Sequence, residues 1–99
     1  MKQRLTVLGS TGSIGTSTLD VVRRHPDQFE IFALSAATQV DALLAQCQAF
    51  TPRYAVMASA AHAAQLAEKL KQNNLKTEVL QAPDALETIA SHAEVDTVM

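Results

Sequence analysis

The sequence is poor in the residue types that mark several classes of protein. It holds a single cysteine, Cys47, which excludes an internal disulfide and is typical of a reducing compartment such as the cytoplasm. Its net charge of −2 gives no basic surface of the kind that nucleic-acid binding needs. No apolar run approaches the roughly 20 residues that span a bilayer, and no signal peptide precedes the first predicted strand. These absences favour a cytoplasmic protein that binds neither nucleic acid nor membrane.

Glycine and proline are also scarce, with three residues of each in the chain. All three glycines lie within the seven residues from Gly9 to Gly15, whereas glycines in ordinary turns would be scattered along the chain. Pro26 and Pro52 each follow a helical pattern, which a proline ends. The apolar residues, 47% of the chain, alternate between strand-like runs and helix-like stripes.

This alternation predicts an α/β fold, a Rossmann-like doubly wound parallel sheet in a three-layer α/β/α arrangement. Strands are expected at residues 5–8, Phe29–Ser35, Tyr54–Met57, 78–80 and 95–99. Helices are expected at Ser13–Arg24, Val40–Phe50, Ala60–Gln72 and 84–92. Because the chain ends within its last apolar strand, without a covering helix, the pattern predicts an incomplete domain, a fragment of a longer protein.

Each predicted helix carries an apolar stripe that should face the sheet. The stripe residues are Ile14, Thr18, Val21, Val22 and His25 in the first helix, Val40, Leu43, Leu44, Cys47 and Phe50 in the second, and Ala63, Leu66, Ala67 and Leu70 in the third. Ser59 is a candidate N-cap, and Asp84 with Glu87 is a candidate capping pair. Cys47 is accordingly interpreted as a core residue rather than a nucleophile.

The glycine-rich segment Gly9–Gly15 lies between a predicted strand and a predicted helix, where nucleotide phosphates bind in α/β proteins. Gly9 would make the turn, Gly12 would let the backbone approach a diphosphate, and Gly15 would let the helix pack closely. The hydroxyls between them, on Ser10, Thr11 and Ser13, could donate to phosphate oxygens, although Thr11 or Ser13 could equally cap the helix. The competing interpretation of the segment is a tight turn without a ligand.

The end of the second strand should select the nucleotide. NAD sites place an Asp or Glu there, on the ribose 2′-hydroxyl. Here the sequence runs from Leu34 to Gln39 without a carboxylate, and Glu30 lies at the wrong end of the strand. The missing acid favours NADP over NAD but does not demand it, because no Arg or Lys stands there either. His25, His62 and His92 follow no metal-ligand spacing, and no general base or nucleophile is recognisable, so no catalytic or metal-binding residue is predicted.

These residues resemble the 1-deoxy-D-xylulose 5-phosphate reductoisomerase family. The resemblance is carried by the segments at 5–15, 17–22, 52–57 and 94–99, and the GSTGSIG-x-STLDVV run is its most specific part. It implies that residues 1–99 are the N-terminal part of an NADP(H)-binding Rossmann-like domain, without the catalytic domain. The resemblance implies that the full-length enzyme converts 1-deoxy-D-xylulose 5-phosphate to 2-C-methyl-D-erythritol 4-phosphate in non-mevalonate isoprenoid biosynthesis, using NADPH and Mn²⁺ or Mg²⁺ bound outside this chain. It also implies a homodimer.

In that family the cofactor is held by residues that match Thr11, Gly12, Ser13 and Ile14 and by a Gly-Lys-Asn cluster that here reads Ala37, Thr38 and Gln39. The family's lysine is therefore missing, and backbone N–H groups and the Thr38 hydroxyl are expected to substitute for it. Together with Gly9, Ser10 and Gly15, these residues form the predicted cofactor site. Two alternatives remain open: another NADP-dependent dehydrogenase with the same glycine spacing, and a non-enzymic nucleotide-sensing domain.

Overall fold

The computed structural model describes residues 2–82 and 84–99, which form five strands and four helices in alternation. The strands are β1 (Gln3–Val7), β2 (Phe29–Ser35), β3 (Tyr54–Met57), β4 (Glu78–Gln81) and β5 (Thr97–Val98). The helices are α1 (Ser13–Arg24), α2 (Val40–Phe50), α3 (Ala60–Gln72) and α4 (Asp84–Ser91). The predicted order of elements is confirmed, and the bounds of β2, β3 and the first three helices agree with the predicted ones.

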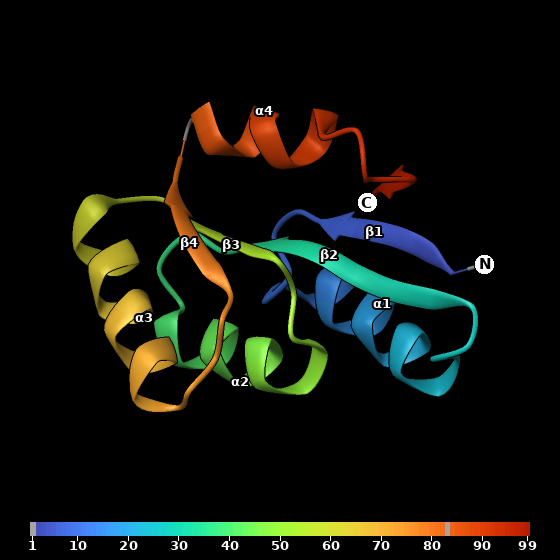
Figure 1. The fold of residues 1–99 in the computed structure, drawn as a ribbon, viewed down its shortest axis with the longest axis horizontal. Coiled ribbons are helices and arrows are strands. Elements are labelled where there is room, and N and C mark those ends of the chain that lie inside the picture. The colour runs from blue at the N-terminus through green and yellow to red at the C-terminus, as the bar shows by residue number, and fades with distance from the viewer. Residues whose placement is uncertain (1, 83) are drawn as a thin grey trace.

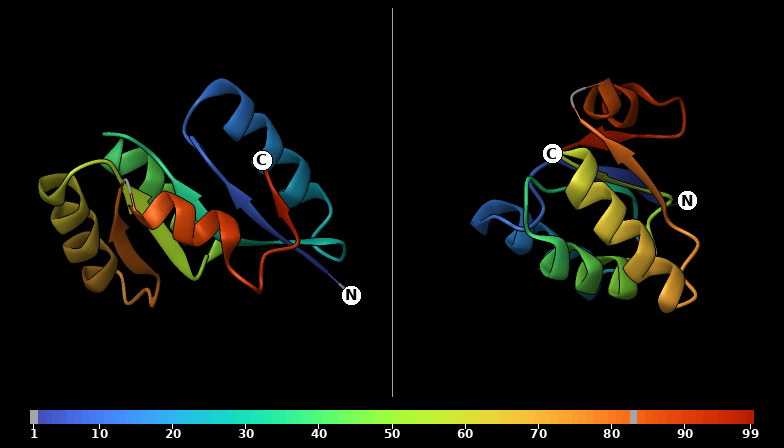
Figure 2. Two further views of the ribbon diagram at one scale, coloured as in Figure 1. Left: turned by 90° about the horizontal axis from the view of Figure 1, so that it is seen from above. Right: turned by 90° about the vertical axis from the view of Figure 1, so that its left-hand side faces the viewer.

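All strand pairs of the sheet are parallel, and the strand order is β4-β3-β2-β1-β5. The chain adds strands in one direction from β1 to β4 and then crosses to the opposite side of β1 for β5. Helices α1, α2 and α3 cover one face of the sheet, and α4 covers the other (Figures 1 and 2). The predicted three-layer α/β fold is therefore confirmed, and its strand order reverses between β1 and β5.

The two faces of the sheet are covered unequally. The face under α1, α2 and α3 holds the larger cluster of buried side chains, which includes Leu34, Leu43 and Leu66. The face under α4 holds a small cluster in which Ile89 packs against Phe32 and other residues. The hydroxyl of Thr6, buried in β1, donates to the Ile89 carbonyl over 2.9 Å and ties α4 to the centre of the sheet.

The predicted apolar face of α1 is wrong except at Val22, which is buried. The residues that α1 buries are Gly15, Leu19 and Val22, whereas Ile14 is 85% exposed and Val21 is 49% exposed. Gly15 carries no side chain, so hydrophobicity does not reveal it as a core-facing position, although it is spaced from Leu19 and Val22 as one helical stripe requires. The α2 stripe is confirmed, because Val40, Leu43 and Cys47 are buried and Leu44 and Phe50 pack against the core.

Several boundaries also differ from the predicted ones. The first strand begins earlier and ends at Val7, because its exposed first residues still pair with β2 and Leu8 already lies in a turn. The last strand covers only Thr97–Val98, with Val98 half exposed at the edge of the sheet. In α3, Ala67 is exposed, while Leu66 and Leu70 are buried.

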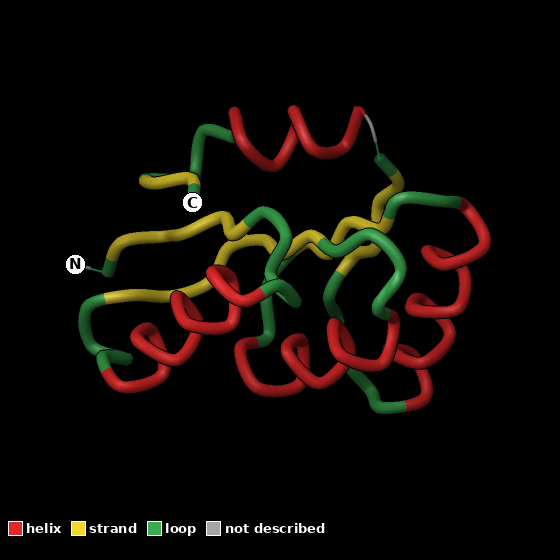
Figure 3. Tube along the Cα trace, turned by 180° about the vertical axis from the view of Figure 1, so that it is seen from behind, coloured by secondary structure: helices red, strands yellow, loops and turns green. Residues whose placement is uncertain are grey.

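A serine cap marks the start of α3, whereas α4 begins at the residue expected to cap it. The Ser59 cap of α3 is confirmed, since its hydroxyl accepts from the N–H of His62. Asp84, expected to be the cap of α4, is instead the first residue of that helix. Figure 3, a view from behind, shows that each helix runs back alongside the sheet. The next strand can therefore start at the same end of the sheet as the strand before it.

Candidate functional site

The glycine-rich segment joins the carboxyl end of β1 to α1, beside the point where the strand order reverses. Leu8 at its start donates its N–H to the Met99 carbonyl over 2.8 Å, which brings the ends of β1 and β5 together. In open α/β sheets, ligands bind outside the carboxyl ends of the strands at such a reversal. The topology thus places the segment that the sequence singled out at the position where this fold binds ligands.

The three glycines meet different requirements. Gly9 has a φ of +64°, in the left-handed region that favours glycine. At Gly15 a Cβ would lie 2.5 Å from the Gly9 carbonyl oxygen and 2.6 Å from the Ser10 Cα, which real side chains do not tolerate. At Gly12 a Cβ would meet its nearest neighbour at 3.4 Å, an ordinary contact. The chain's own fold therefore favours glycine at position 9 and requires it at position 15, but has room for a side chain at position 12.

Helix α1 begins immediately behind Gly12, which is its N-cap residue. The alternative that Thr11 or Ser13 caps α1 is wrong, and within the described part of the chain no side chain caps this helix. Its first turn contains no acid, and the segment from Gly9 to Leu19 contains no charged residue. The N–H groups and positive dipole end of the helix are therefore not neutralised by the protein, an arrangement that suits an anion.

Ser10 is buried, and its polar groups are bonded within the protein. Its N–H donates to the Ser35 carbonyl over 2.8 Å, and its hydroxyl donates to Gln46 Oε1 over 2.6 Å. Gln46 Nε2 donates in return to the Ser10 carbonyl over 2.8 Å, and the N–H of Gly9 donates to Ser35 Oγ over 3.0 Å. Ser10 thus fixes the shape of the loop, while Thr11 is half-buried and Ser13 is exposed.

Sequence reasoning did not identify Ser35 and Gln46 as parts of this site. The sequence does carry a signal for Ser35, a hydroxyl residue at the end of an apolar strand, where a parallel strand meets its loop. In the structure Ser35 is 5% exposed. Gln46 has a weaker signal, an amide between Leu43 and Cys47 on the buried side of α2. Its partner Ser10 is 36 residues away, which periodicity does not reveal.

The second predicted segment, Ala37 to Gln39, follows β2 at the same edge of the sheet. The three residues are exposed, and the Ala37 carbonyl accepts from the N–H of Ala58 over 3.2 Å, beside the end of β3. Gln39 is the N-cap residue of α2 and, among the residues described, makes no capping hydrogen bond through its side chain. Through Ser35, which bonds to Gly9 and Ser10, the structure brings the two predicted segments to one edge.

Cys47 and His92, which sequence reasoning set aside, lie outside this edge. Cys47 is buried beneath α2, and burial raises the pKa of its thiol to about 12, so the thiol is protonated at neutral pH. This confirms that Cys47 is a core residue. His92 packs against Phe32 in a tilted arrangement, with 4.7 Å between ring centroids. Within residues 2–82 and 84–99, no group of three or more His, Cys, Asp or Glu side chains could hold a metal ion.

None of the helices within the described residues has the length and apolar character needed to cross a bilayer.

Known proteins match the chain over nearly its whole length. The sequence profile of the 1-deoxy-D-xylulose 5-phosphate reductoisomerase family matches residues 5–99. The reductoisomerase of Tolumonas auensis is 56% identical and that of Aromatoleum aromaticum 54% identical, each over 97 residues, 98% of this chain. In both cases the chain spans 24% of the relative's length.

Solved structures give the same result. A reductoisomerase in complex with NADPH, fosmidomycin and magnesium superposes with a TM-score of 0.92 at 42% identity, over 97% of this chain and 23% of that one. The Zymomonas mobilis enzyme in complex with NADPH superposes with a TM-score of 0.86 at 33% identity, over 95% of this chain and 24% of that one. The sequence and the fold therefore agree: the chain belongs to the 1-deoxy-D-xylulose 5-phosphate reductoisomerase family.

Proposed function

We propose that residues 1–99 are the NADPH-binding part of a longer reductoisomerase that converts 1-deoxy-D-xylulose 5-phosphate to 2-C-methyl-D-erythritol 4-phosphate. The observation that carries this proposal is Gly12. Its position has room for a Cβ, and it caps a helix whose first turn contains no acid. A glycine that the fold itself does not require is explained by a ligand whose phosphates approach the backbone there.

The loop fits a diphosphate by its shape and its electrostatics. Thr11, Gly12, Ser13 and Ile14 surround the start of α1. The N–H of Gly12 donates to the Gly9 carbonyl over 3.1 Å, so the backbone N–H groups of the other three residues and the two hydroxyls would hold the phosphate oxygens. Gly9, Ser10 and Gly15 would maintain the conformation of the loop. The exposed Ile14 side chain would give the cofactor an apolar contact beside the diphosphate.

Ala37, Thr38 and Gln39 would receive the adenosine ribose and its 2′-phosphate. The residues from Ala36 to Val40 include no carboxylate that would repel this phosphate. In the absence of the family's lysine, the Thr38 hydroxyl and the N–H groups at the start of α2 would be its donors. Asp41, the nearest acid along the chain, is paired with Lys69 at 3.1 Å.

NADPH, when bound, supplies the hydride that reduces the rearranged substrate. The residues of this chain bind and orient the cofactor, and none of them is proposed to exchange a proton with the substrate. We further propose that the catalytic residues, the substrate phosphate site and the Mg²⁺ or Mn²⁺ ion belong to the remainder of the enzyme. The longer enzyme is proposed to be a cytoplasmic homodimer.

Calorimetry on the full-length enzyme tests this function. NADPH should bind at least about tenfold more tightly than NADH, because only NADPH carries the 2′-phosphate. Gly12→Val should weaken NADPH binding by at least about 30-fold, since its methyl groups occupy the approach to the helix N-terminus, while the melting temperature changes little. Equal affinities for the two cofactors would contradict the NADP assignment, and undiminished NADPH binding by Gly12→Val would show that the loop is not the cradle.

A further inference from the structure

The glycine loop is held from the sheet side by one residue of β2. Ser35 accepts from the N–H of Ser10 through its carbonyl and from the N–H of Gly9 through its hydroxyl, at 2.8 and 3.0 Å. These two bonds fix the start of the loop to the sheet. They do not restrain the carbonyl of Ser10, which begins the turn toward Thr11 and Gly12.

Gln46 restrains that part of the loop from the opposite side. Its amide bonds to Ser10 at two points, by accepting from the hydroxyl over 2.6 Å and by donating to the carbonyl over 2.8 Å. A planar amide that makes both bonds fixes the peptide plane after Ser10 as well as the position of that residue. Because Ser10 is 0% exposed, these groups would lose most of their hydrogen bonding if the amide were removed.

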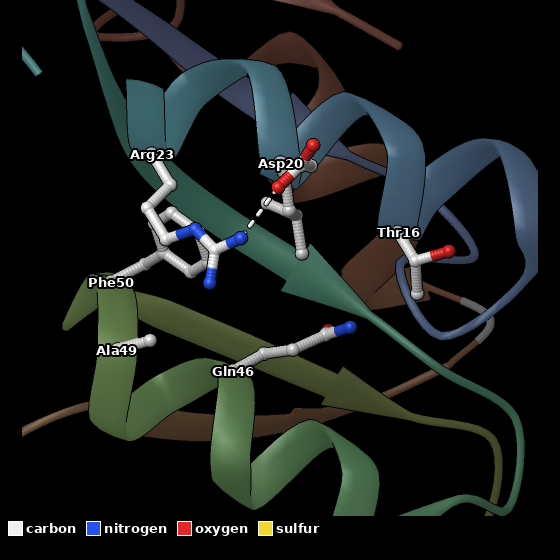
Figure 4. A pocket seen from close by; sticks show the side chains of 7 residues that line it. Thr16, Asp20, Arg23, Gln46, Ala49 and Phe50 are labelled. Atoms are coloured by element: carbon white, nitrogen blue, oxygen red, sulfur yellow. Dashed lines mark hydrogen bonds and ion pairs between the residues drawn. The ribbon is translucent and has the colours of Figure 1, made fainter. Parts of the chain in front are cut away.

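The surroundings of Gln46 indicate that packing is not its main role. It lines a hollow of about 190 Å³ between α1 and α2, together with Thr16, Asp20, Arg23 and other residues (Figure 4). In Figure 4 the side chain extends from α2 along this hollow toward the first turns of α1, whereas Asp20 and Arg23 pair with each other. A long side chain that is only half-buried loses rotamer entropy in this position, and the two bonds to Ser10 offset that loss.

We propose that Gln46 is a positioning residue for the cofactor, which holds the glycine loop in the conformation that receives the NADPH diphosphate. This inference rests on the proposed function of the loop. Binding energy is then not spent on ordering a segment in which three of seven residues are glycine. Gln46 does not touch the diphosphate itself. It acts through Ser10.

The test uses the full-length enzyme with Gln46→Met, which keeps the length of the side chain but neither donates nor accepts strongly. Gln48→Met is the matched control, because Gln48 lies on the same helix and its amide bonds to Asn73 over 3.2 Å on the surface. Gln46→Met should raise the Kd of NADPH, measured by fluorescence titration, about tenfold. With saturating NADPH, kcat and the KM of the sugar phosphate should stay within about twofold, and Gln48→Met should change none of these values.

Ser10→Ala provides an independent arm, which also serves if Gln46→Met does not fold. Ser10→Ala removes only the hydrogen bond made by the hydroxyl and should raise the Kd of NADPH about threefold. The variant with both substitutions should have the same NADPH Kd as Gln46→Met alone. An unchanged NADPH Kd in either single variant overturns the proposal. A fall in kcat with no change in Kd also overturns it, because that pattern indicates general damage. If the unaltered enzyme fails to bind NADPH, the proposed function fails instead.

Discussion

The two ends of the parallel sheet are built from different chemistry. At the carboxyl end, the segments 9–19, 36–40 and 58–67 contain no Asp, Glu, Lys or Arg. At the amino end, charges gather around the starts of the strands, where Arg4 pairs with Glu30 at 2.9 Å and with Glu94 at 3.7 Å, and Arg53 also pairs with Glu94. The hydrogen bond that Arg4 donates to the Glu30 carboxylate raises the pKa of Arg4, with further contributions from the charges of Glu30, Glu94 and Asp96.

This difference shows that the charged side chains are placed at the solvent-exposed amino end of the strands. The amino-end side chains are 41–56% exposed, so water and salt weaken their attraction and each pair contributes little to stability. The carboxyl end offers backbone N–H groups and the N-terminus of α1, whose first turn contains no acid, whereas the first turn of α2 contains Asp41. A ligand with several phosphates would bring the negative charge that this end lacks.

Gly15→Ala should have the largest effect on the folded protein. Its Cβ would lie within 2.6 Å of two backbone atoms of the loop, so the strain cannot be relieved by rotating a flexible side chain. We expect the free energy of unfolding to fall by about 3 kcal/mol, measured by urea denaturation. Gly12→Ala, whose Cβ has room, is the control and should change it by less than about 0.5 kcal/mol. Similar losses in both variants would show that the loop is not packed against α1 as described.

The sequence predicted the elements well because each strand and helix is marked by local signals. The apolar runs of β2 and β3, the Ser59 cap and Pro52 behind α2 all act within a few residues of the boundary that they define. The glycine loop was predictable for the same reason, since its three glycines recur at every third residue and lie between a strand and a helix.

Features that exist only in the folded chain were not predictable. The buried face of α1 is set by Gly15, whose tight contact with Gly9 and Ser10 exists only in the folded loop. The bonds between Ser10 and Gln46 and the ion pair between Arg53 and Glu94 join residues 36 and 41 positions apart. A single sequence gives no signal that relates such positions, because helical and strand periodicity act over one element at a time.

Thr38→Lys should sharpen the contrast between the two ends by adding a cation to the neutral one. If Thr38 lies beside the 2′-phosphate, the added ammonium should tighten NADPH binding by about fivefold and leave NADH unchanged. Calorimetry at two salt concentrations measures the effect, which should shrink as salt rises. Gln48→Lys, on the exposed side of α2, controls for net charge and should affect neither cofactor. An equal gain for NADH in Thr38→Lys would place the lysine elsewhere than at the 2′-phosphate.

Glu94→Gln should have the smallest effect, although Glu94 contacts both Arg4 and Arg53. The substitution keeps the shape of the side chain and removes its charge, while Arg4 retains Glu30. Because these groups are exposed, we expect the melting temperature to fall by less than about 3 °C at low salt and by less still at high salt. The Kd of NADPH should not change, since Glu94 and its two arginine partners lie at the amino end of the strands, opposite the glycine loop. A loss of cofactor affinity comparable with that of Gly12→Val would mean that the two ends are energetically coupled and that charge at the amino end also serves the site.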